Sequence, residues 1–279
     1  MIAPALQDDA FLADVGRARR ESAPGRLYVW WLGQSGFLLL HAGEFLLFDP
    51  YLSDALTKKY AATDKPHVRM TARVVDPARL EFVKVVTSSH QHTDHFDPDT
   101  LRPLFASSPA AKLVLPAATL AAASDRLGAA GVDRFVPLRD GERIALGSFT
   151  VEAVPAAHEE LAPVYAGFVV SVGAFRIYHS GDTVLFPGME ARLRPWAVDL
   201  ALLPINGRAP ERRVSGNLDG VEAARLAHAI GARVVVPCHY EMFTFNTASP
   251  ADFVAECARL GQACAVLRAG QRWTLDTRP

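Results

Sequence analysis

Cysteine is scarce in this chain, and long apolar runs are missing. The three cysteines, Cys238, Cys257 and Cys264, are too few for a disulfide framework and suit a reducing compartment. No apolar run approaches the ~20 residues that a membrane-spanning helix needs. Residues 1–9 lack the basic and then apolar layout of a secretory signal. These absences predict a cytoplasmic protein with no membrane partner.

Neither sign of charge is in excess. The formal net charge is -1, so no basic surplus indicates binding to nucleic acid or to an anionic membrane. Hydrophobic residues make up 50% and charged residues 21%, which excludes extended disorder. No linker and no clear repeat divides the 279 residues, so we expect one domain over 1–279. The expected partner is a small-molecule substrate. A homo-oligomer is neither predicted nor excluded, because no segment of the sequence stands out as a subunit interface.

Short apolar segments alternate with helical ones along the chain. A helix is expected over about 7–20, and strands over 27–32, 36–40 and 44–48. The polar stretch 54–78 indicates a long surface loop. The elements expected after it are a strand at 82–87, a helix from about 98, a strand at 112–115, a helix near 117–129, a meander over about 134–179, a strand at 200–203, a helix at about 219–230, a strand at 233–236 and a helix near 250–260. Two β-rich stretches, each followed by helices, predict a layered α/β domain whose strand order stays open.

The segment 88–98 concentrates ligand-type side chains. Three imidazoles and a carboxylate fall within six positions, at His90, His92, Asp94 and His95. Imidazole and carboxylate groups suit zinc, manganese or iron(II), and their spacing divides naturally between two ions. An apolar strand precedes the motif, and Asp97 followed by Pro98 is typical of a helix start. Ligands on a strand-to-helix loop indicate a rigid metal site rather than a histidine-rich surface loop.

Three further ligand candidates share one context. His158, Asp182 and His239 each follow an apolar strand. Taken alone, a histidine at a strand end is more often a hydrogen-bonded structural residue, and Asp182 is compatible with an ordinary Asx turn. Taken with the ligand-type side chains of 88–98, all three favour metal binding. The carboxylate of Asp182 suits a bridging position, because its two oxygens can each face one ion.

Four segments together resemble the metallo-β-lactamase superfamily. They span residues 31–37, 49–54, 89–95 and 179–183. Three later segments, 204–207, 216–218 and 236–243, resemble the branch typified by L-ascorbate-6-phosphate lactonase. The likeness runs from about 28 to 267 and implies an αββα sandwich, an α/β fold of two mixed β-sheets with helices on the outer faces. It also implies a site at one rim between the sheets.

The resemblance assigns roles to individual residues. The ligands of one ion would be His90, His92 and His158, and those of the other Asp94, His95 and His239, with Asp182 bridging them. Asp49 would hydrogen-bond a ligating imidazole and fix its tautomer. His179, by its place in the chain, is expected to pack behind Asp182 without serving as a ligand.

The charges of such a site predict its chemistry. Two divalent cations bring about four positive charges, the two aspartates return about two and a bridging hydroxide about one, so an anionic or oxygen-rich substrate is favoured. A water shared by two ions ionises near neutral pH, and Asp94 is the candidate proton acceptor. We therefore expect a dinuclear metal-dependent hydrolase that attacks an ester, lactone, amide or phosphoester. Zinc, manganese and iron all fit, and the resemblance favours manganese. A phosphodiesterase acting on a small phosphoester and a non-catalytic metal-binding protein remain alternatives.

Side chains for the substrate are less sharply indicated. Tyr240 adjoins His239 and is a candidate catalytic hydrogen-bond donor, although a packing role is equally consistent. The candidate substrate-binding residues, which a solvated basic loop explains as well, are Asn206, Arg208 and Arg212, with Arg213 beside them. His67 and Arg69 are expected to cover the pocket. Cys238 is expected in the core, and His41 and His228 at surface or structural positions.

Overall fold

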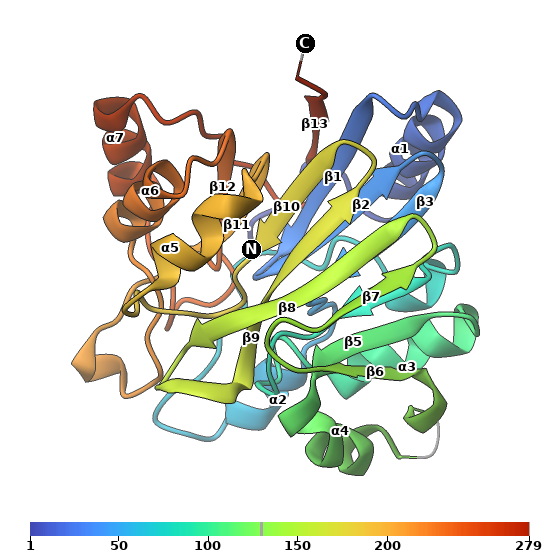
Figure 1. Ribbon diagram of the computed structural model, residues 1–279. Coiled ribbons are helices and arrows are strands. Elements are labelled where there is room, and N and C mark those ends of the chain that lie inside the picture. Colours follow the sequence, from blue (N-terminus) through green and yellow to red (C-terminus); the bar gives the residue numbers. More distant parts are fainter. Residues whose placement is uncertain (129–130, 279) are drawn as a thin grey trace.

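A computed structural model describes residues 1–128 and 131–278 and shows two β-sheets packed face to face with helices outside (Figure 1). One sheet has seven strands in the order β13-β1-β2-β3-β4-β5-β6. The other has six in the order β12-β11-β10-β9-β8-β7. In each sheet antiparallel pairs give way to parallel ones, at β3–β4 and at β10–β11. The αββα sandwich predicted from the sequence is confirmed.

The first sheet joins an N-terminal meander to three parallel strands. Its strands are β1 (Arg26–Gly33), β2 (Gly36–His41), β3 (Glu44–Phe48), β4 (Val85–Thr87), β5 (Lys112–Pro116), β6 (Phe135–Leu138) and β13 (Arg272–Asp276). Almost every residue of β1, β2 and β3 is buried. Such continuous apolar strands require cover on both faces. The helices of this half are α1 (Asp8–Glu21), α2 (Ala55–Tyr60), α3 (Pro98–Ser107) and α4 (Leu120–Leu127).

The second sheet repeats this plan. Its strands are β7 (Arg143–Leu146), β8 (Phe149–Ala157), β9 (Leu161–Val172), β10 (Phe175–His179), β11 (Leu200–Pro204) and β12 (Val234–Cys238). Its helices are α5 (Met189–Leu193), α6 (Gly220–Ala229) and α7 (Ala251–Leu260). Helix α6 packs against β11 and β12, and α7 packs against α6 (Figure 1). The core between the sheets is one continuous apolar cluster that draws residues from both.

Short 3₁₀ turns punctuate the connections: η1 (Pro77–Arg79), η2 (Ala117–Thr119), η4 (Val132–Arg134), η5 (Arg194–Trp196) and η6 (Pro210–Arg212). Helix α3 begins at Pro98 as predicted, and the Asp97 carboxylate accepts hydrogen bonds from the Asp99 amide at 3.1 Å and the Thr100 hydroxyl at 2.5 Å. At α6 a capping box joins Asp219 and Glu222, so this helix start is equally well fixed. Within the described residues no helix is long and apolar enough to cross a membrane.

Three expected elements differ from the observed ones. The stretch 54–78 is not a plain loop, since it contains α2 and η1, and Leu56 of α2 packs beside Tyr51, Met242 and Phe243. The strand expected at 82–87 covers only Val85–Thr87, because a turn precedes it in which the Val83 amide donates to the Leu80 carbonyl at 3.1 Å. The helix expected near 117–129 divides into η2 and α4, and its expected last residue lies outside the described residues.

The strand order brings distant parts of the chain to one rim. Strands β3, β4, β8, β10 and β12 all end within a few residues of a predicted site residue. Polar side chains just beyond the carboxyl ends of such strands converge on a shared crevice. The rim is therefore where the site must be sought.

Candidate metal centre

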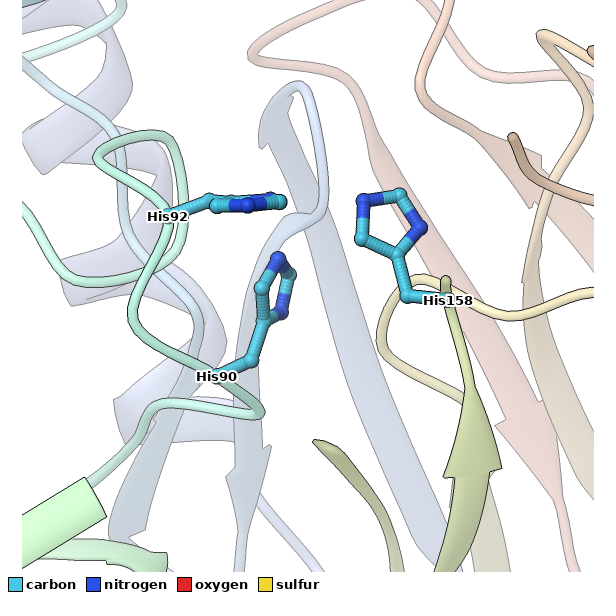
Figure 2. A group of neighbouring side chains, drawn as sticks. All are labelled: His90, His92 and His158. Carbon is cyan, nitrogen blue, oxygen red and sulfur yellow. The ribbon is translucent and has the colours of Figure 1, made fainter. Parts of the chain in front are cut away.

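Three imidazoles meet at this rim. His90 and His92 come from the loop after β4, and His158 directly follows β8. Each offers one ring nitrogen, and these three atoms lie within 4.8 Å of one another. Their rings are turned toward a common point (Figure 2), with centroids 4.6 Å apart for the His90–His92 pair and 5.0 Å for the His92–His158 pair.

A second group lies beside the first. It consists of Asp94, His95, Asp182 and His239, whose ligand-type atoms also lie within 4.8 Å of one another. His239 Nε2 is 3.2 Å from Asp182 Oδ2 and 3.4 Å from Asp94 Oδ2. His95 Nε2 is 3.3 Å from Asp182 Oδ1. All seven predicted ligands are thus gathered in two adjacent groups.

Asp182 stands between the two groups. Its Oδ2 atom is 3.6 Å from His158 Nε2 of the first group and 3.2 Å from His239 Nε2 of the second. The tight turn that presents it depends on Gly181, which has a positive φ of 59° and whose missing Cβ would lie 2.5 Å from the Ser89 Cβ. A side chain at residue 181 would therefore displace the loop that carries His90.

Hydrogen bonds behind the rings set their tautomers. The His95 Nδ1–H group donates to Asp49 Oδ2 at 2.8 Å, and both side chains are fully buried. Asp49 also accepts from the Ser89 amide at 3.0 Å and the Thr87 hydroxyl at 2.7 Å, so its position is fixed. His158 Nδ1 donates to the Gly216 carbonyl at 2.9 Å. In both histidines Nε2 is left to face the centre, as ligation requires.

His179 packs behind this layer, as expected. Its Nε2 donates to the Ser35 carbonyl at 2.9 Å, and its ring stacks on Phe48 with centroids 4.6 Å apart. The Gly181 amide donates to its Nδ1 at 3.3 Å, which ties the turn before Asp182 to the core. His179 therefore supports the site without facing its centre.

The centre itself fits cations. Among the described residues, His90 Nε2, His95 Nε2 and Asp182 Oδ1 are buried without a hydrogen-bond partner. Leaving buried acceptors unpaired is costly, and native structures seldom do so without a reason. Imidazole nitrogens and carboxylate oxygens are also the donor types that divalent ions of the zinc, manganese and iron class accept. The unpaired atoms and their chemistry both point to metal binding.

The protonation behaviour of the second group agrees. Burial would raise the pKa of the Asp182 carboxyl, but the charges of His239 and His95 outweigh it and hold this pKa well below its usual range. The pKa of the Asp94 carboxyl is lowered likewise, because the neighbouring His95 charge favours its ionised form although burial opposes ionisation. Burial opposes protonation of His239, yet the two carboxylates raise its pKa to about 9. The carboxylates thus stay ionised at neutral pH, which is the form that binds a cation.

The first group behaves in the opposite way. Burial and the nearby His95 charge hold the pKa of His90 well below its ordinary value. Burial also lowers the pKa of His158. Neutral imidazoles are the form that binds a metal, so these two rings need not lose a proton to do so at neutral pH.

Gln34 belongs to the site, although no role was assigned to it from the sequence. Its Nε2 donates to Asp94 Oδ2 at 2.7 Å and lies 3.0 Å from His239 Nε2. Gln34, Asp49 and His239 all adopt positive φ angles, of 51°, 35° and 63°. Backbone strain of this kind in non-glycine residues clusters at functional sites.

A cavity of about 410 Å³ opens beside both groups. Its lining includes the ligand candidates His92, Asp94, His158, Asp182 and His239. Residues of α2, of the loop after it and of the 213–215 segment also line it, among them Lys59, Tyr60, Lys65, His67 and Arg213. Of the residues expected to cover the pocket, His67 lines it. Arg69 does not, since its guanidinium pairs with Asp54 at 2.7 Å and donates to the Ser53 carbonyl.

Tyr240, the candidate catalytic hydrogen-bond donor, does not line this cavity. Its hydroxyl donates to the Leu267 carbonyl at 2.5 Å, and its ring stacks on Trp31 with centroids 4.4 Å apart. The side chain is 2% exposed and lies outside the cavity lining. The positive φ angles of His239 and Glu241, 63° and 54°, turn the backbone so that neighbours in sequence face different ways.

The predicted substrate contacts of the 206–212 loop are engaged in hydrogen bonds within the chain. Arg208 forms a two-pronged pair with Glu222 at 2.8 and 2.6 Å, because the α6 capping box places that carboxylate within its reach. Arg212 donates to the Asn206 carbonyl at 2.7 Å and to Asn246 Oδ1 at 3.0 Å. The Asn206 side chain is bonded to Asn217 and Asn246, each at 3.0 Å. None of these three residues lines the cavity, whereas Arg213 does.

Arg126 is a contributor that no local pattern indicated. From α4 it donates to the Gln91 carbonyl, to the Thr93 hydroxyl at 3.3 Å and to the Phe96 carbonyl at 2.7 Å. It therefore clamps the loop that carries four ligand candidates. Of the residues judged structural, Cys238 is buried in the core as predicted, and His41 is buried with Nε2 donating to the Pro24 carbonyl at 2.9 Å.

Comparison with known proteins agrees with this geometry. A family model described as "Beta-lactamase superfamily domain" matches residues 45–240. A "UPF0173 metal-dependent hydrolase" from Opitutus terrae is 31% identical over 251 residues, covering 86% of this chain and 96% of that protein. A protein of the same description from Rubrobacter xylanophilus is 29% identical over 252 residues, covering 85% and 91%.

A solved structure shares the fold. Igni18, described as a novel metallo hydrolase from Ignicoccus hospitalis, superposes with a TM-score of 0.67 at 22% identity, covering 91% of this chain and 100% of that one. The family match spans the ligand loops after β4, β8 and β10 and reaches His239 after β12. The chain therefore belongs to the metallo-β-lactamase superfamily.

Proposed function

We propose that this protein is a metal-dependent hydrolase that holds two divalent cations and acts on a small anionic ester or lactone. The observation that supports it most is the pair of adjacent ligand groups joined through Asp182, with buried acceptor atoms turned to their centres. The relatives named metal-dependent hydrolases support the same reading. Fold alone would not, because one fold carries many activities.

The two ligand groups differ in composition. The first offers three imidazole nitrogens, and the second two imidazoles and two carboxylates. Zinc, manganese and iron are all compatible with these donors. The carboxylate of Asp182 would face both ions, and Asp49 would keep the His95 ring in its ligating tautomer.

Cations held by these residues would supply Lewis-acid chemistry, lowering the pKa of a bound water molecule and polarising the oxygen of an ester or lactone group. The side chains of the protein would accept the proton of the attacking water and hold the accepting group in place. Asp94, placed between Gln34 and His239, is positioned to accept the proton of the attacking water. The amide of Gln34 would hold that carboxylate in place while the proton moves.

The substrate is inferred from size and charge. A cavity of about 410 Å³ suits a small molecule. Its lining carries Lys59, Lys65, Arg126 and Arg213 besides the two aspartates of the site, so an anion is favoured. A phosphorylated sugar lactone, as the likeness to the ascorbate-phosphate lactonase branch implies, combines these properties. We place this activity in the cytoplasm, with no nucleic-acid or membrane partner.

The proposal is tested with metal-depleted protein reloaded with Zn²⁺ or Mn²⁺. We expect metal-dependent hydrolysis of lactones, and loss of that activity and of bound metal in an Asp182→Asn variant. Asp140→Asn, which removes an exposed carboxylate paired with Arg192, is the control and should retain both. Faster cleavage of bis-p-nitrophenyl phosphate than of any lactone would instead make the protein a phosphodiesterase. Full metal binding without hydrolysis of either substrate would favour a non-catalytic metal-binding protein.

A further inference from the structure

The cavity beside the ligand groups is lined by two lysines from one short stretch of chain. Lys59 lies in the last turn of α2, and Lys65 in the loop after it, and both line the cavity. We propose that Lys59 and Lys65 bind an acidic group of the substrate at a distance from the bond that is cleaved. The inference rests on the proposed function and deepens it, because it names what the substrate must carry.

No salt bridge among the described residues involves either lysine. The Lys65 ammonium donates to the Arg213 carbonyl at 2.5 Å, which is a neutral partner. The Lys59 ammonium lies 5.1 Å from the centre of the Tyr60 ring. Neither lysine belongs to an ion pair with any carboxylate in the described parts of the chain. The other two cations of the lining are engaged, since Arg213 pairs with Asp64 and Arg126 clamps the ligand loop.

Residues beside the two lysines are held by stacking and hydrogen bonds, so the backbone at both lysines is anchored. The His67 ring stacks on Tyr60 with centroids 4.4 Å apart and meets Phe243 edge-on at 5.2 Å. His67 Nδ1 donates to the Lys65 carbonyl at 2.9 Å, and the Thr57 hydroxyl donates to the His67 carbonyl at 2.7 Å. A wall fixed by stacking and hydrogen bonds loses little entropy when it receives a ligand.

Two sets of lining residues would divide the work of recognition. The ligand groups would take the reacting oxygen atoms, and the two lysines of the same lining would offer ammonium groups that no salt bridge occupies. An ammonium recognises phosphate and carboxylate as a point charge. The substrate class is therefore an ester or lactone with a phosphate or carboxylate at its far end, and this acidic group is retained in the product.

The test compares a phosphorylated lactone, a carboxylated lactone and their neutral hydroxyl analogue in a Lys59→Gln/Lys65→Gln variant. Lys58→Gln is the matched control, because Lys58 is the exposed neighbour on α2 and lies outside the cavity lining. We expect KM for an acidic substrate to rise about tenfold or more with kcat changed less than about threefold. Hydrolysis of the neutral lactone should be unaltered.

A binding measurement separates this inference from the proposed function. Calorimetric titration with glycerol phosphate, which has no lactone to cleave, should show about tenfold weaker binding to the double variant than to the wild type or Lys58→Gln. Equal binding by all three proteins, or an equal loss of activity on the acidic and neutral lactones, would overturn the role of the lysines. If the wild type hydrolyses no lactone yet the titration shows the loss, the proposed function fails and the anion site stands.

Discussion

Arg126 offers the sharpest test of how the ligand loop is held. Its guanidinium reaches across from α4 to three oxygens of residues 91–96 and lies 4.9 Å from the centre of the Phe96 ring. Glutamine is too short and uncharged to replace this fork. A hydrogen bond from a charged group contributes roughly 1.5–3 kcal/mol, and the partial exposure of Arg126 argues for about 2 kcal/mol over the whole set.

If that energy holds the loop ready for metal, Arg126→Gln should weaken metal binding by about 30-fold. The assay is competition for Zn²⁺ with a chelator of known affinity, paired with hydrogen exchange of the amides in 91–96, which should speed up. Arg20→Gln, an exposed arginine on α1, is the control and should match the wild type. Unchanged affinity together with unchanged exchange would refute the reasoning, because the clamp would then hold nothing that the metal needs.

Three further predictions concern the groups behind the ligands. Asp49→Asn removes the charge that fixes the His95 tautomer, so metal affinity should fall about 10–100-fold in the same competition assay, and an unchanged affinity would argue against the Asp49 role. Tyr240→Phe should leave kcat within about twofold but lower the free energy of unfolding by about 1 kcal/mol, because only the hydrogen bond to the Leu267 carbonyl is lost. A large fall in kcat would instead support a catalytic role for Tyr240. In metal-depleted protein, the raised pKa of His239 contributes stability that is complete below about pH 6.5 and lost as pH rises through about 9. Denaturant titrations should show this decline without metal and a smaller one with Zn²⁺, whereas equal declines would contradict the assignment.

The fold and the ligands could be predicted from the sequence for a physical reason. A ligand that follows an apolar strand within a few residues inherits the position of that strand, so His158, Asp182 and His239 needed only a correct sandwich to converge. The helix start at Asp97 was equally local, because a cap depends on adjacent residues. Where the determinant lies within a few residues, the pattern is sufficient.

Contacts set by distant partners could not be predicted in the same way. Tyr240 adjoins the candidate ligand His239, but its hydroxyl points toward Leu267. The reason is that the residues on either side of Tyr240 adopt left-handed backbone conformations. Arg208 resembled an anion-binding residue, and only the folded chain shows that its guanidinium is already paired with the Glu222 carboxylate. Arg126 reaches its loop from 30 residues away, a spacing that no local motif records.

Metal content and position measured in one experiment test the central claim most directly. Crystals of protein purified without chelator, with anomalous scattering recorded at the metal edge, should show two ions per chain. We predict one ion against His90, His92 and His158, a second against Asp94, His95 and His239, and Asp182 in contact with both. A single ion, or ions bound away from these side chains, would contradict the account.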